Sequence, residues 1–395
     1  MPWKTVSLVQ ARQQLVEAML ARHQSLQVVA RRFGISRKTA YKWLDRFRRG
    51  GRSGLGDRSR RPHRFARQLD PGRIGLIVRW RRRRPFWGAK KLYQQLRRSG
   101  LACLPCVRTV ERWLKRRGWV RPRRHRARRG PALPLPGLTQ PQRPNQVWTV
   151  DFKGWFRTGD GVRQEPLTVR DLFSRYGLCV RLLPNQEDRA VRHTFQRLFR
   201  ERGLPQAIRV DNGSPFGGKG ALGLSRLSVW WLRLGIRVEF TRRARPGDNG
   251  AHEQFHGCYQ REVVAATAAD RRAMQRRSTQ WLASYNHQRP HEALGQRTPA
   301  QLYRPSRRTY PHRLPALRYP RQWPVRRVRN RGHIKWQGRL RFIGRAFVGQ
   351  TLALQPSDPN QWQVFLGRQL IGHLHAHDHA GLRPARWLRT APLKV

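Results

Sequence analysis

The sequence predicts a multidomain protein with all-α modules at the N-terminal end, a central α/β domain with a mixed five-stranded sheet, and a small antiparallel β-barrel near the C-terminal end. Three observations predict this class. Helical apolar periodicity dominates residues 7–119, strand-like runs alternate with helices from Gln146 onward, and short alternating strands separated by glycines follow residue 322. A length of 395 residues is enough for several domains.

Charge is the dominant feature of the composition. Lys and Arg supply 84 residues against 21 Asp and Glu, giving a formal net charge of +63. Such a chain requires an anionic partner, and DNA or RNA is the expected one, with an anionic membrane surface as the alternative. The 15 Trp, 15 Phe and 8 Tyr residues predict folded domains despite a hydrophobic fraction of 38%. No run of 18 or more apolar residues and no signal-peptide pattern is present, and four cysteines form no paired framework, so we expect a cytoplasmic protein without a membrane partner.

Residues 1–60 are predicted to form a helix-turn-helix domain. Leu26, Val29 and Phe33 share one helix face, Gly34 allows a tight turn, and Ser36 is suited to cap the next helix. A helix of this size fits the major groove of DNA, and the alternative is a helical hairpin with a basic face. The basic side chains expected to contact DNA on this helix are Arg37, Lys38, Lys42 and Arg46.

Residues 61–122 are predicted to form a second helix-turn-helix or winged-helix-like domain, with helices near 88–99 and 107–119. Its candidate DNA-binding residues are Arg108, Arg112, Lys115 and Arg116. The arginine run and spaced prolines of 123–143 predict a basic linker that crosses DNA phosphates.

The central α/β domain is expected over residues 144–306. Strand-like runs occupy 147–152, 165–173, 177–184, 206–213 and 237–241, and an amphipathic helix covers 187–203 between the third and fourth of them. Three successive strands followed by a helix and a strand indicate a mixed sheet. A helix-rich stretch at 223–235 precedes the fifth strand, and a turn at Pro246–Gly250 precedes a further helix.

A second proline- and arginine-rich linker is predicted at 307–322, followed by the barrel at 323–382 and a tail at 383–395. The alternating histidines of 373–379 allow a zinc site, but such histidines at the end of an edge strand more often form a solvated tail, which is the preferred interpretation.

Three acidic residues stand at structurally similar places in this acid-poor chain. Asp151 and Asp211 end two apolar strands, and Glu253 lies in the first turns of the helix after the turn. Strand ends and helix starts present side chains to ligands, and carboxylate oxygens suit Mg²⁺ or Mn²⁺. Two such ions support phosphoryl transfer. Taken singly, each acid is better explained by a salt bridge to one of the many arginines, and only the three together, with their contexts, reverse that preference.

Glu253 also belongs to a competing pattern. His252-Glu253-Gln254-Phe255-His256 matches H-E-x-x-H, in which two histidines bind zinc and the glutamate is the general base of a metallopeptidase. This reading leaves Asp151, Asp211 and the basic charge unexplained.

The motifs in series resemble the catalytic core of bacterial insertion-sequence transposases of the retroviral-integrase type. They are WTVDFKG (148–154), TVRDLFSRY (168–176), RVDNGSPF (209–216), LGIRVEFTRRARPGDNGAHEQFHG (234–257) and YNHQRPHEALGQRTPAQLY (285–303). The segments at 35–51 and 54–63 and the C-terminal strands resemble other parts of that family. The interval between Asp211 and Glu253 is longer than in retroviral integrases, and the N-terminal zinc-binding module of those enzymes is not evident.

The resemblance implies a ribonuclease H-like fold with a DDE triad at Asp151, Asp211 and Glu253, and two Mg²⁺ or Mn²⁺ ions per active site. Asp151 is expected to bridge both ions, while Asp211 and Glu253 each hold one. It implies binding of terminal inverted repeats, cleavage at the element ends and joining of the freed 3′-hydroxyl to target DNA. Double-stranded DNA as partner, a homo-oligomer on DNA and a bacterial, nucleoid-associated location follow.

Several residues are expected to support this site rather than to react. Asn212 and Asn249 are expected to shape the turns beside the acids, and His256 either touches a substrate phosphate or supports the site. The YNHQRPH segment is expected to close the catalytic domain structurally. The alternative functions are an inactive or domesticated DNA-binding regulator and, third, a zinc peptidase built on His252, Glu253 and His256.

Overall fold

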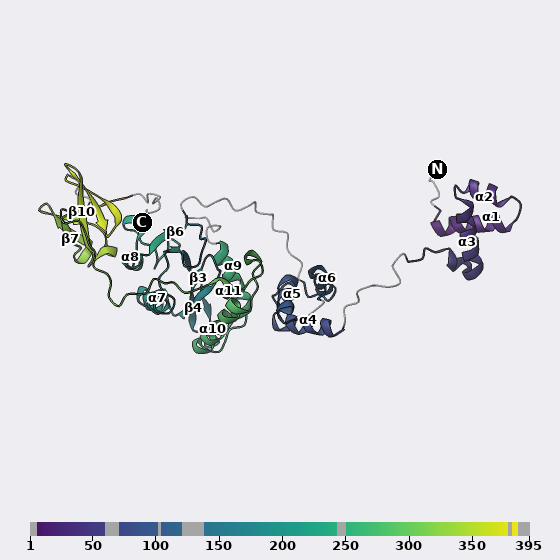
Figure 1. Cartoon of the computed structure of the whole chain (residues 1–395), viewed down its shortest axis with the longest axis horizontal. Coiled ribbons are helices and arrows are strands. Elements are labelled where there is room, and N and C mark those ends of the chain that lie inside the picture. The colour runs from purple at the N-terminus through teal and green to yellow at the C-terminus, as the bar shows by residue number, and fades with distance from the viewer. Residues whose placement is uncertain are drawn as a thin grey trace. The chain divides into compact units, whose positions relative to one another are not determined.

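The computed structural model describes residues 6–59, 71–101, 104–120, 138–242, 250–377 and 381–385. The chain divides into two compact units, Met1–Leu69 and Asp70–Val395 (Figure 1). The basic linker expected at 123–143 and the tail expected at 383–395 lie largely outside the described residues.

The first unit is a small bundle of helices that contains the predicted helix-turn-helix. Gly34 adopts φ +65°, as the tight turn requires, and the Ser36 hydroxyl accepts a hydrogen bond from the backbone N–H of Thr39, so it caps the second helix of the pair. Trp43 and Leu44 pack on Val16 in the core. The helices are α1 (Leu8–Leu20), α2 (Leu26–Arg32), α3 (Arg37–Gly50) and the 3₁₀ segment η1 (Gly51–Leu55).

The second unit begins with another helical module. Its helices are α4 (Pro71–Arg83), α5 (Ala89–Arg98) and α6 (Val107–Arg116). Trp87, Leu92 and Val110 are buried at their centre. The two predicted helices are present and α4 completes the cluster, whereas the described residues of this module contain no strand, so the winged alternative finds no support there.

The centre of the second unit is the predicted mixed sheet. Its strands are β1 (Val147–Phe152), β2 (Phe156–Arg157), β3 (Arg163–Asp171), β4 (Gly177–Leu183), β5 (Ala207–Val210) and β6 (Arg237–Phe240). The spatial order is β4-β3-β1-β5-β6, and β2 pairs with the start of β3. The β3 strand runs antiparallel to β1 and β4, whereas β1, β5 and β6 are parallel. The five expected strands are confirmed, with β2 as a short addition.

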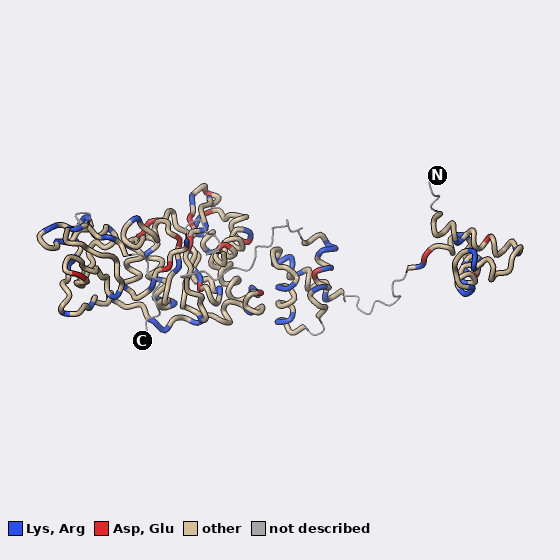
Figure 2. Tube along the Cα trace, turned by 90° about the horizontal axis from the view of Figure 1, so that it is seen from above, with Lys and Arg blue, Asp and Glu red and all other residues tan. Residues whose placement is uncertain are grey.

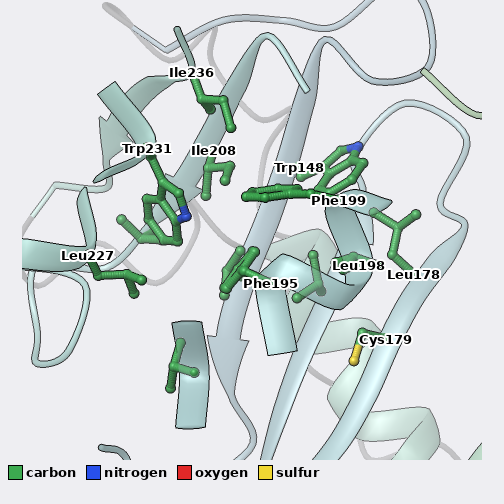
Figure 3. Packing of buried hydrophobic residues seen from close by; sticks show 14 of the residues in the cluster. Trp148, Leu178, Cys179, Phe195, Leu198, Phe199, Ile208, Leu227, Trp231 and Ile236 are labelled. Carbon is green, nitrogen blue, oxygen red and sulfur yellow. The ribbon is translucent and has the colours of Figure 1, made fainter. Parts of the chain in front are cut away.

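Helices cover both faces of this sheet. They are α7 (Asp188–Arg202), η2 (Ala221–Gly223), α8 (Arg226–Arg233), α9 (Gly250–Tyr259), the π-helical η4 (Gln260–Val264), α10 (Arg271–His287), η5 (Glu292–Leu294) and α11 (Pro299–Leu302). Residues of α7 and α8 pack on one face, where the rings of Phe195 and Trp231 lie 5.0 Å apart (Figure 3). Residues of α9 and α10 pack on the other face against Val180 and Leu182 of β4. Cys179 and Leu183 of β4 pack on the first face, so the residues of this strand from Cys179 onward divide between the two faces.

The C-terminal region is antiparallel, as predicted. Its strands are β7 (Val325–Arg327), β8 (His333–Trp336), β9 (Arg339–Phe342), β10 (Thr351–Asp358), β11 (Gln361–Leu366), β12 (Gln369–His375) and β13 (Arg383–Pro384), with 3₁₀ segments η6 (Asn330–Gly332) and η7 (Arg345–Phe347). Five strands form a sheet in the order β13-β12-β11-β10-β7, and β8 and β9 form a separate hairpin. The pairing of the described residues is that of an open sheet, so the predicted barrel closure is not confirmed.

The C-terminal sheet shares a hydrophobic core with the central domain. Leu222 and Val229, from the stretch between β5 and β6, are buried together with Phe347, Leu352 and Val364 of the C-terminal strands. The helix-rich stretch predicted at 223–235 therefore packs on two layers, its own sheet and the C-terminal strands.

Lys and Arg recur along the trace of every part of the chain, whereas Asp and Glu are sparse (Figure 2). This distribution spreads the charge of +63 over the helical modules, the central domain and the C-terminal strands. Within the described ranges, no helix combines the length and apolarity needed to cross a membrane.

Candidate active site

The parallel pairing of β1 and β5 determines where two of the three acids lie. Val147, Trp148 and Thr149 of β1 stand opposite Ala207, Ile208 and Arg209 of β5. Asp151 lies near the end of β1, and Asp211 directly follows β5. Since carboxyl ends of neighbouring parallel strands meet at one edge of a sheet, the two acids share that edge.

Asp151 is the most perturbed of the three acids. Its side chain is 28% exposed. The pKa of Asp151 is raised to about 7, chiefly by burial and then by the negative charges of Asp211 and Glu253, while Lys153 acts in the opposite direction. Asp211 and Glu253 therefore both lie within electrostatic reach of Asp151.

Asp211 lies on an exposed turn that its neighbours shape. Burial of its carboxyl raises the pKa of Asp211, and the backbone N–H of Gly213 lowers it. A Cβ atom at Gly213 would lie 3.0 Å from Oδ2 of Asp211, so glycine leaves room for that carboxylate. Asn212 donates from Nδ2 to the carbonyl oxygen of Thr241 at 2.6 Å, which ties the turn to the end of β6. This contact agrees with the turn-shaping role expected for Asn212.

Glu253 is an exposed residue in the first turn of α9. Asn249, expected to shape the start of this helix, lies outside the described residues. Across the described part of the chain, no three His, Cys, Asp or Glu side chains are gathered closely enough to hold a metal ion. The charges of Asp211 and Glu253 thus act on Asp151, but the three carboxylates are not close enough together to coordinate one metal ion. Repulsion between carboxylates favours such a separation. Their hard oxygen donors are nevertheless the type that Mg²⁺ and Mn²⁺ take.

The two histidines that flank Glu253 converge on one hydroxyl group. Nε2 of His252 lies 2.6 Å and Nε2 of His256 lies 2.7 Å from Oγ1 of Thr168 on β3. That hydroxyl donates its single proton to the carbonyl oxygen of Asp151 at 2.9 Å, so both imidazoles donate to it through Nε2–H. Nδ1 of His252 then accepts from the hydroxyl of Thr149 at 2.8 Å.

These contacts fix the tautomer of both rings. With Nε2 protonated, His256 presents an unprotonated Nδ1, which lies 3.9 Å from Oδ2 of Asp151. Burial lowers the pKa of His256 to about 3 and that of His252 well below its ordinary value, with nearby Arg170 acting in the same direction on both. Both rings are therefore neutral at neutral pH and serve as hydrogen-bonding groups that fasten α9 to β1 and β3.

The same geometry opposes the zinc-peptidase reading. In an H-E-x-x-H site each of the two imidazoles directs one ring nitrogen toward the metal ion. Here the Thr168 hydroxyl already occupies the position between the two Nε2 atoms. His252 is fully buried, and the described residues supply no third ligand.

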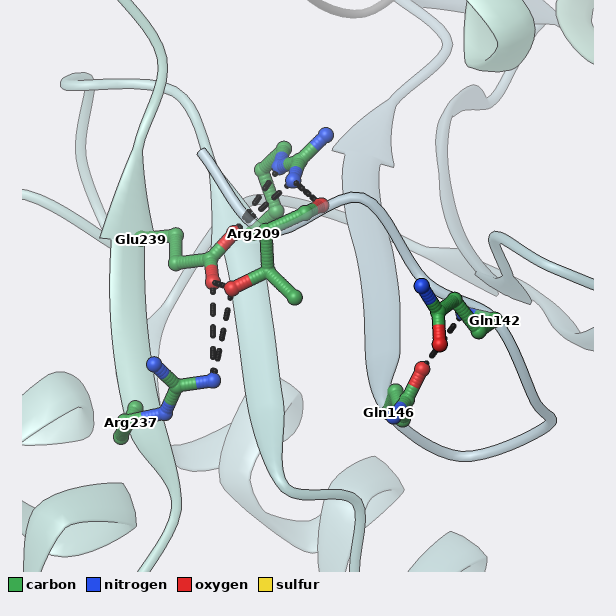
Figure 4. Close-up of polar contacts among 6 residues, drawn as sticks. Gln142, Gln146, Arg209, Arg237 and Glu239 are labelled. Carbon is green, nitrogen blue, oxygen red and sulfur yellow. Dashed lines mark hydrogen bonds and ion pairs between the residues drawn. The ribbon is translucent and has the colours of Figure 1, made fainter. Parts of the chain in front are cut away.

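The other buried acids near the sheet have structural partners. Asp171 accepts from the backbone N–H groups of Asn145 and Ser174, both at 2.7 Å, and so closes the turn after β3. Glu239 accepts from Arg209 at 2.9 Å across the parallel β5–β6 pair (Figure 4). Asp171 and Glu239 therefore bind protein groups rather than adding to the carboxylate cluster.

The YNHQRPH segment has a structural role. Asn286 accepts from the backbone N–H of Gly177 and donates to its carbonyl oxygen, both at 2.8 Å, so it fixes the start of β4. Arg289 pairs with Glu262 of η4. Asn286, Arg289 and His291 are all buried, which agrees with closure of the domain rather than DNA contact.

The candidate DNA-binding side chains lie on the outer faces of their helices. Arg37, Lys38 and Lys42 of α3 are exposed, and Arg46 is half-buried beside Trp43. On α6, Arg108, Arg112, Lys115 and Arg116 are exposed. Both sets are accessible to a nucleic acid.

Sequence reasoning missed two residues of the site. Thr149 and Thr168 carry no signal of their own, because threonine is common in strands.

Family models match most of the chain. Those described as "Helix-turn-helix domain" and "Homeodomain-like domain" match residues 11–63 and 39–114. Two described as "Integrase core domain" match 141–246 and 234–299, and one described as "IS481 family transposase, C-terminal domain" matches 324–379. The two core matches together contain Asp151, Asp211 and Glu253.

Two relatives come from bacterial insertion elements. An uncharacterized 31.7 kDa protein of IS407 from Burkholderia multivorans is 28% identical over 217 residues, which cover 54% of this chain and 68% of the relative. An uncharacterized 39.2 kDa protein of IS476 from Xanthomonas euvesicatoria is 27% identical over 160 residues, 40% of this chain and 44% of the relative. Among solved structures, the magnesium complex of the HTLV-2 integrase catalytic core domain is 15% identical and aligns over 42% of this chain and all of its own, with a TM-score of 0.34.

Proposed function

We propose that this chain, a member of the insertion-sequence transposases of the integrase superfamily with a role in DNA binding and recombination, cuts the ends of its own element and joins them to target DNA. The catalytic residues are Asp151, Asp211 and Glu253. The proposal rests on one observation above all, that Asp151 near the end of β1 lies within electrostatic reach of both Asp211, directly after β5, and Glu253, at the start of α9.

The three carboxylates hold the divalent cations, Mg²⁺ or Mn²⁺. A bound cation supplies counter-charge and Lewis acidity to the reacting phosphate. The raised pKa of Asp151 supports this role. The negative charges of Asp211 and Glu253 destabilise the ionised form of Asp151, and a bound cation would offset that repulsion.

The chemistry consists of two in-line displacements at phosphorus. In the first, water forms a new P–O bond and the bond to the 3′-oxygen of the element strand breaks, leaving a 3′-hydroxyl. In the second, that hydroxyl attacks a target phosphodiester, and the displaced target 3′-oxygen takes up the proton. The protein positions both strands, and the acid cluster holds the charge that develops on the phosphate.

We assign a separate role in DNA binding or catalysis to each domain. We assign residues 1–60 and 61–122 to recognition of the terminal inverted repeats, through the exposed basic residues of α3 and α6. We assign 144–306 to catalysis, with 123–143 and 307–322 as linkers before and after it and the C-terminal strands of 323–382 as an additional DNA-facing layer. Neutral His256 and Asn212 support the acids, and we assign the same role to Asn249. The assembly acts as a homo-oligomer that brings two element ends together.

The test uses the full-length protein and a labelled duplex that carries the inverted repeats flanking its gene. Wild type is expected to release a 3′-hydroxyl end and form strand-transfer products in Mg²⁺ or Mn²⁺, whereas Asp151→Asn, Asp211→Asn and Glu253→Gln bind the ends but do not cut. Asp160→Asn, an exposed acid outside the cluster, is the matched control and is expected to cut normally. Equal behaviour of wild type and Asp151→Asn would leave the DNA-binding regulator as the function.

A further inference from the structure

The central domain contains a cavity of about 540 Å³ beside the start of α9. A volume of this size is typical of sites that hold one small molecule, and it is too small for a segment of duplex DNA. The described residues that line it come from the segment before β1, the turn between β3 and β4, strand β5, the start of α9 and the region of η5 and α11. The cavity therefore forms only when these elements have folded together.

The strand registers place the cavity on the side of the sheet that carries the acids. Arg209, which lines the cavity, stands opposite Thr149 in the parallel β1–β5 pair, so the two side chains share a face. Asp151 follows Thr149 by two residues and faces the same side. Nδ1 of His252 lies 2.8 Å from the Thr149 hydroxyl, so α9 also covers this face.

The wall of the cavity comes close to two of the acids along the chain. Arg209 precedes Asp211 by two residues, a separation of ~7 Å along an extended strand. Ala251, also in the wall, precedes Glu253 by two residues, which is ~3 Å along a helix axis. Phosphates in one strand of a duplex are spaced by ~3.4 Å, so a strand held at the acids reaches the cavity wall within about two nucleotides.

The charged side chains in the lining are all cationic. Arg175, Arg209 and Arg297 line the cavity, and the described lining residues include no acid. Glu239 pairs with Arg209 at 2.9 Å (Figure 4). Arg175 and Arg297 form no ion pair with an acid in the described ranges, and both donate to neutral oxygens instead. The cavity therefore carries positive charge that an anionic ligand would neutralise.

A further arginine lies directly behind the wall. Arg170 on β3 is 1% exposed, and its Nη1 donates to the carbonyl oxygen of Ala251, which lines the cavity. Its Nε and Nη2 are buried and have no hydrogen-bond partner among the described residues. Because a buried charge is poorly screened, Arg170 adds to the positive potential of the cavity.

Much of the remaining lining is apolar. It includes Pro141, Leu172, Phe173, Leu294 and Leu302. An inorganic anion would contact the arginines and leave these side chains unused, whereas an apolar ligand would leave the arginines unused. A nucleotide uses both, because its base packs on aromatic and aliphatic side chains and its phosphate accepts hydrogen bonds from guanidinium groups.

From this combination we propose that the cavity binds one unpaired nucleotide of the DNA strand held at the acid cluster, with its base turned out of the helix onto Phe173 and its flanking phosphates held by Arg175 and Arg297. Turning a base out of a duplex costs a few kcal/mol, and contacts in a closely fitting pocket offset that cost. The inference rests on the proposed function and deepens it, since it specifies the form that the DNA adopts beside the scissile phosphate.

The experiment detects the turned-out base directly. Full-length protein without divalent metal is mixed with duplexes that carry the inverted repeat flanking its gene and a single 2-aminopurine, whose fluorescence rises when it leaves the stack of neighbouring bases. The 2-aminopurine is placed in turn at each position within about five nucleotides of the element end, on both strands. Wild type is expected to raise the fluorescence several-fold at one position and to leave the other positions nearly unchanged.

Three variants test whether the base lies in the cavity. Ala293→Trp fills the cavity without removing charge and is expected to abolish the fluorescence rise. Phe173→Ala removes the ring and is expected to reduce the rise and to weaken duplex binding by up to about 100-fold, the range for loss of one base–aromatic stack. Arg297→Gln, at an exposed side chain, is expected to reduce the rise and to lower the slope of log K against log salt by about 0.7 to 0.9, the value for one phosphate.

Each kind of change has a matched control outside the lining. Ala265→Trp adds the same ring at an exposed alanine after η4, and Arg271→Gln removes the same charge at an exposed arginine of α10. Both are expected to keep the wild-type fluorescence rise. Thermal unfolding near the wild-type temperature shows that Ala293→Trp and Phe173→Ala remain folded, and Arg297→Gln tests the cavity if either does not.

Several outcomes would overturn the inference. Wild type that leaves 2-aminopurine stacked at every position rejects it, and so does a rise that Ala293→Trp and Arg297→Gln do not change. Weaker duplex binding by Arg297→Gln without any fluorescence rise in wild type would make the cavity a contact for backbone phosphate only. Because the assay contains no chemistry, cleavage by wild type without a fluorescence rise rejects only this inference. A cavity-dependent rise without cleavage in Mg²⁺ or Mn²⁺ rejects only the proposed function.

Discussion

The hydroxyl of Thr168 donates to the carbonyl oxygen of Asp151 at 2.9 Å, and the two residues stand directly opposite each other in the β1–β3 register. The same hydroxyl accepts from His252 and His256 on the helix that carries Glu253. A single side-chain oxygen therefore joins the strand of the first acid to the helix of the third.

Replacing Thr168 by valine should uncouple these two elements. The isosteric change removes the hydroxyl, leaving two buried imidazole N–H groups without their acceptor, at a cost of ~1–3 kcal/mol each. We expect the cleavage rate at saturating Mg²⁺ to fall at least ~10-fold, because small displacements of catalytic groups are costly, while end binding is retained. Thr168→Ser should recover most of the rate, and a valine variant that cuts at the wild-type rate would refute the coupling.

The raised pKa of Asp151 predicts a pH-dependent stability difference in metal-free protein. The folded-state pKa of about 7 lies above the ordinary value of 3.8. At pH values above 3.8 the Asp151 carboxyl of the unfolded chain loses its proton more readily than that of the folded protein, which lowers the free energy of unfolding. Below pH ~4 wild type and Asp151→Asn should be equally stable. As the pH rises towards 7, the free energy of unfolding of Asp151→Asn should increase relative to that of wild type by at most ~1.4 kcal/mol per pH unit. Urea unfolding at pH 4 and pH 8 measures this, and a constant difference would contradict it.

Divalent cations should stabilise the folded protein through the same carboxylates. At Mg²⁺ ten times above its Kd the expected gain is ~1.4 kcal/mol, which raises Tm by a few degrees, roughly 2–4 °C per kcal/mol. Asp151→Asn and Asp211→Asn should lose this gain, and Asp160→Asn should keep it. Thermal unfolding with Mg²⁺ and with an equal ionic strength of NaCl separates binding from screening.

DNA binding should fall steeply with salt, since each neutralised phosphate contributes about 0.9 to the slope of log K against log salt. Replacing Arg37, Lys38 and Lys42 of α3 by glutamine should reduce that slope if they contact phosphates. The matched control replaces three exposed arginines of α10 with the same loss of charge, namely Arg271, Arg272 and Arg276. Equal slopes for the two triple variants would remove α3 from the interface.

Purified protein should hold no stoichiometric zinc, because Thr168 already satisfies both histidines of the HEQFH sequence. Metal analysis after dialysis checks this. Bound zinc that disappears in a His252→Ala, His256→Ala double variant would revive the peptidase alternative.

Periodicity and turn chemistry were sufficient to predict the helix-turn-helix, the five principal strands and their mixed pairing. They succeeded because each element signals itself locally, as Gly34 and Ser36 do at their turn. That Asp151 and Asp211 could converge was predicted from their places at strand ends, an argument that needs no contact information.

The remainder depends on contacts between residues far apart in the sequence. Thr149 and Thr168 lie 103 and 84 positions from His252, and nothing in a threonine's neighbours tells which imidazole it will meet. Barrel closure was likewise inferred from strand spacing alone. The partner of each edge strand is a tertiary property, and here β8 and β9 pair with each other instead of extending the five-stranded sheet.

The hydrophobic core shared by α8 and the C-terminal strands limits how this protein can be recombined with its relatives. Leu222, Leu224 and Val229 sit in the interval between Asp211 and Glu253, and the C-terminal strands bury them. Exchanging the C-terminal region for that of another transposase would require the surface of the 221–229 segment to change with it. Chimeras should therefore be soluble only when both segments come from the same parent, so the C-terminal region and this part of the core are expected to be inherited together.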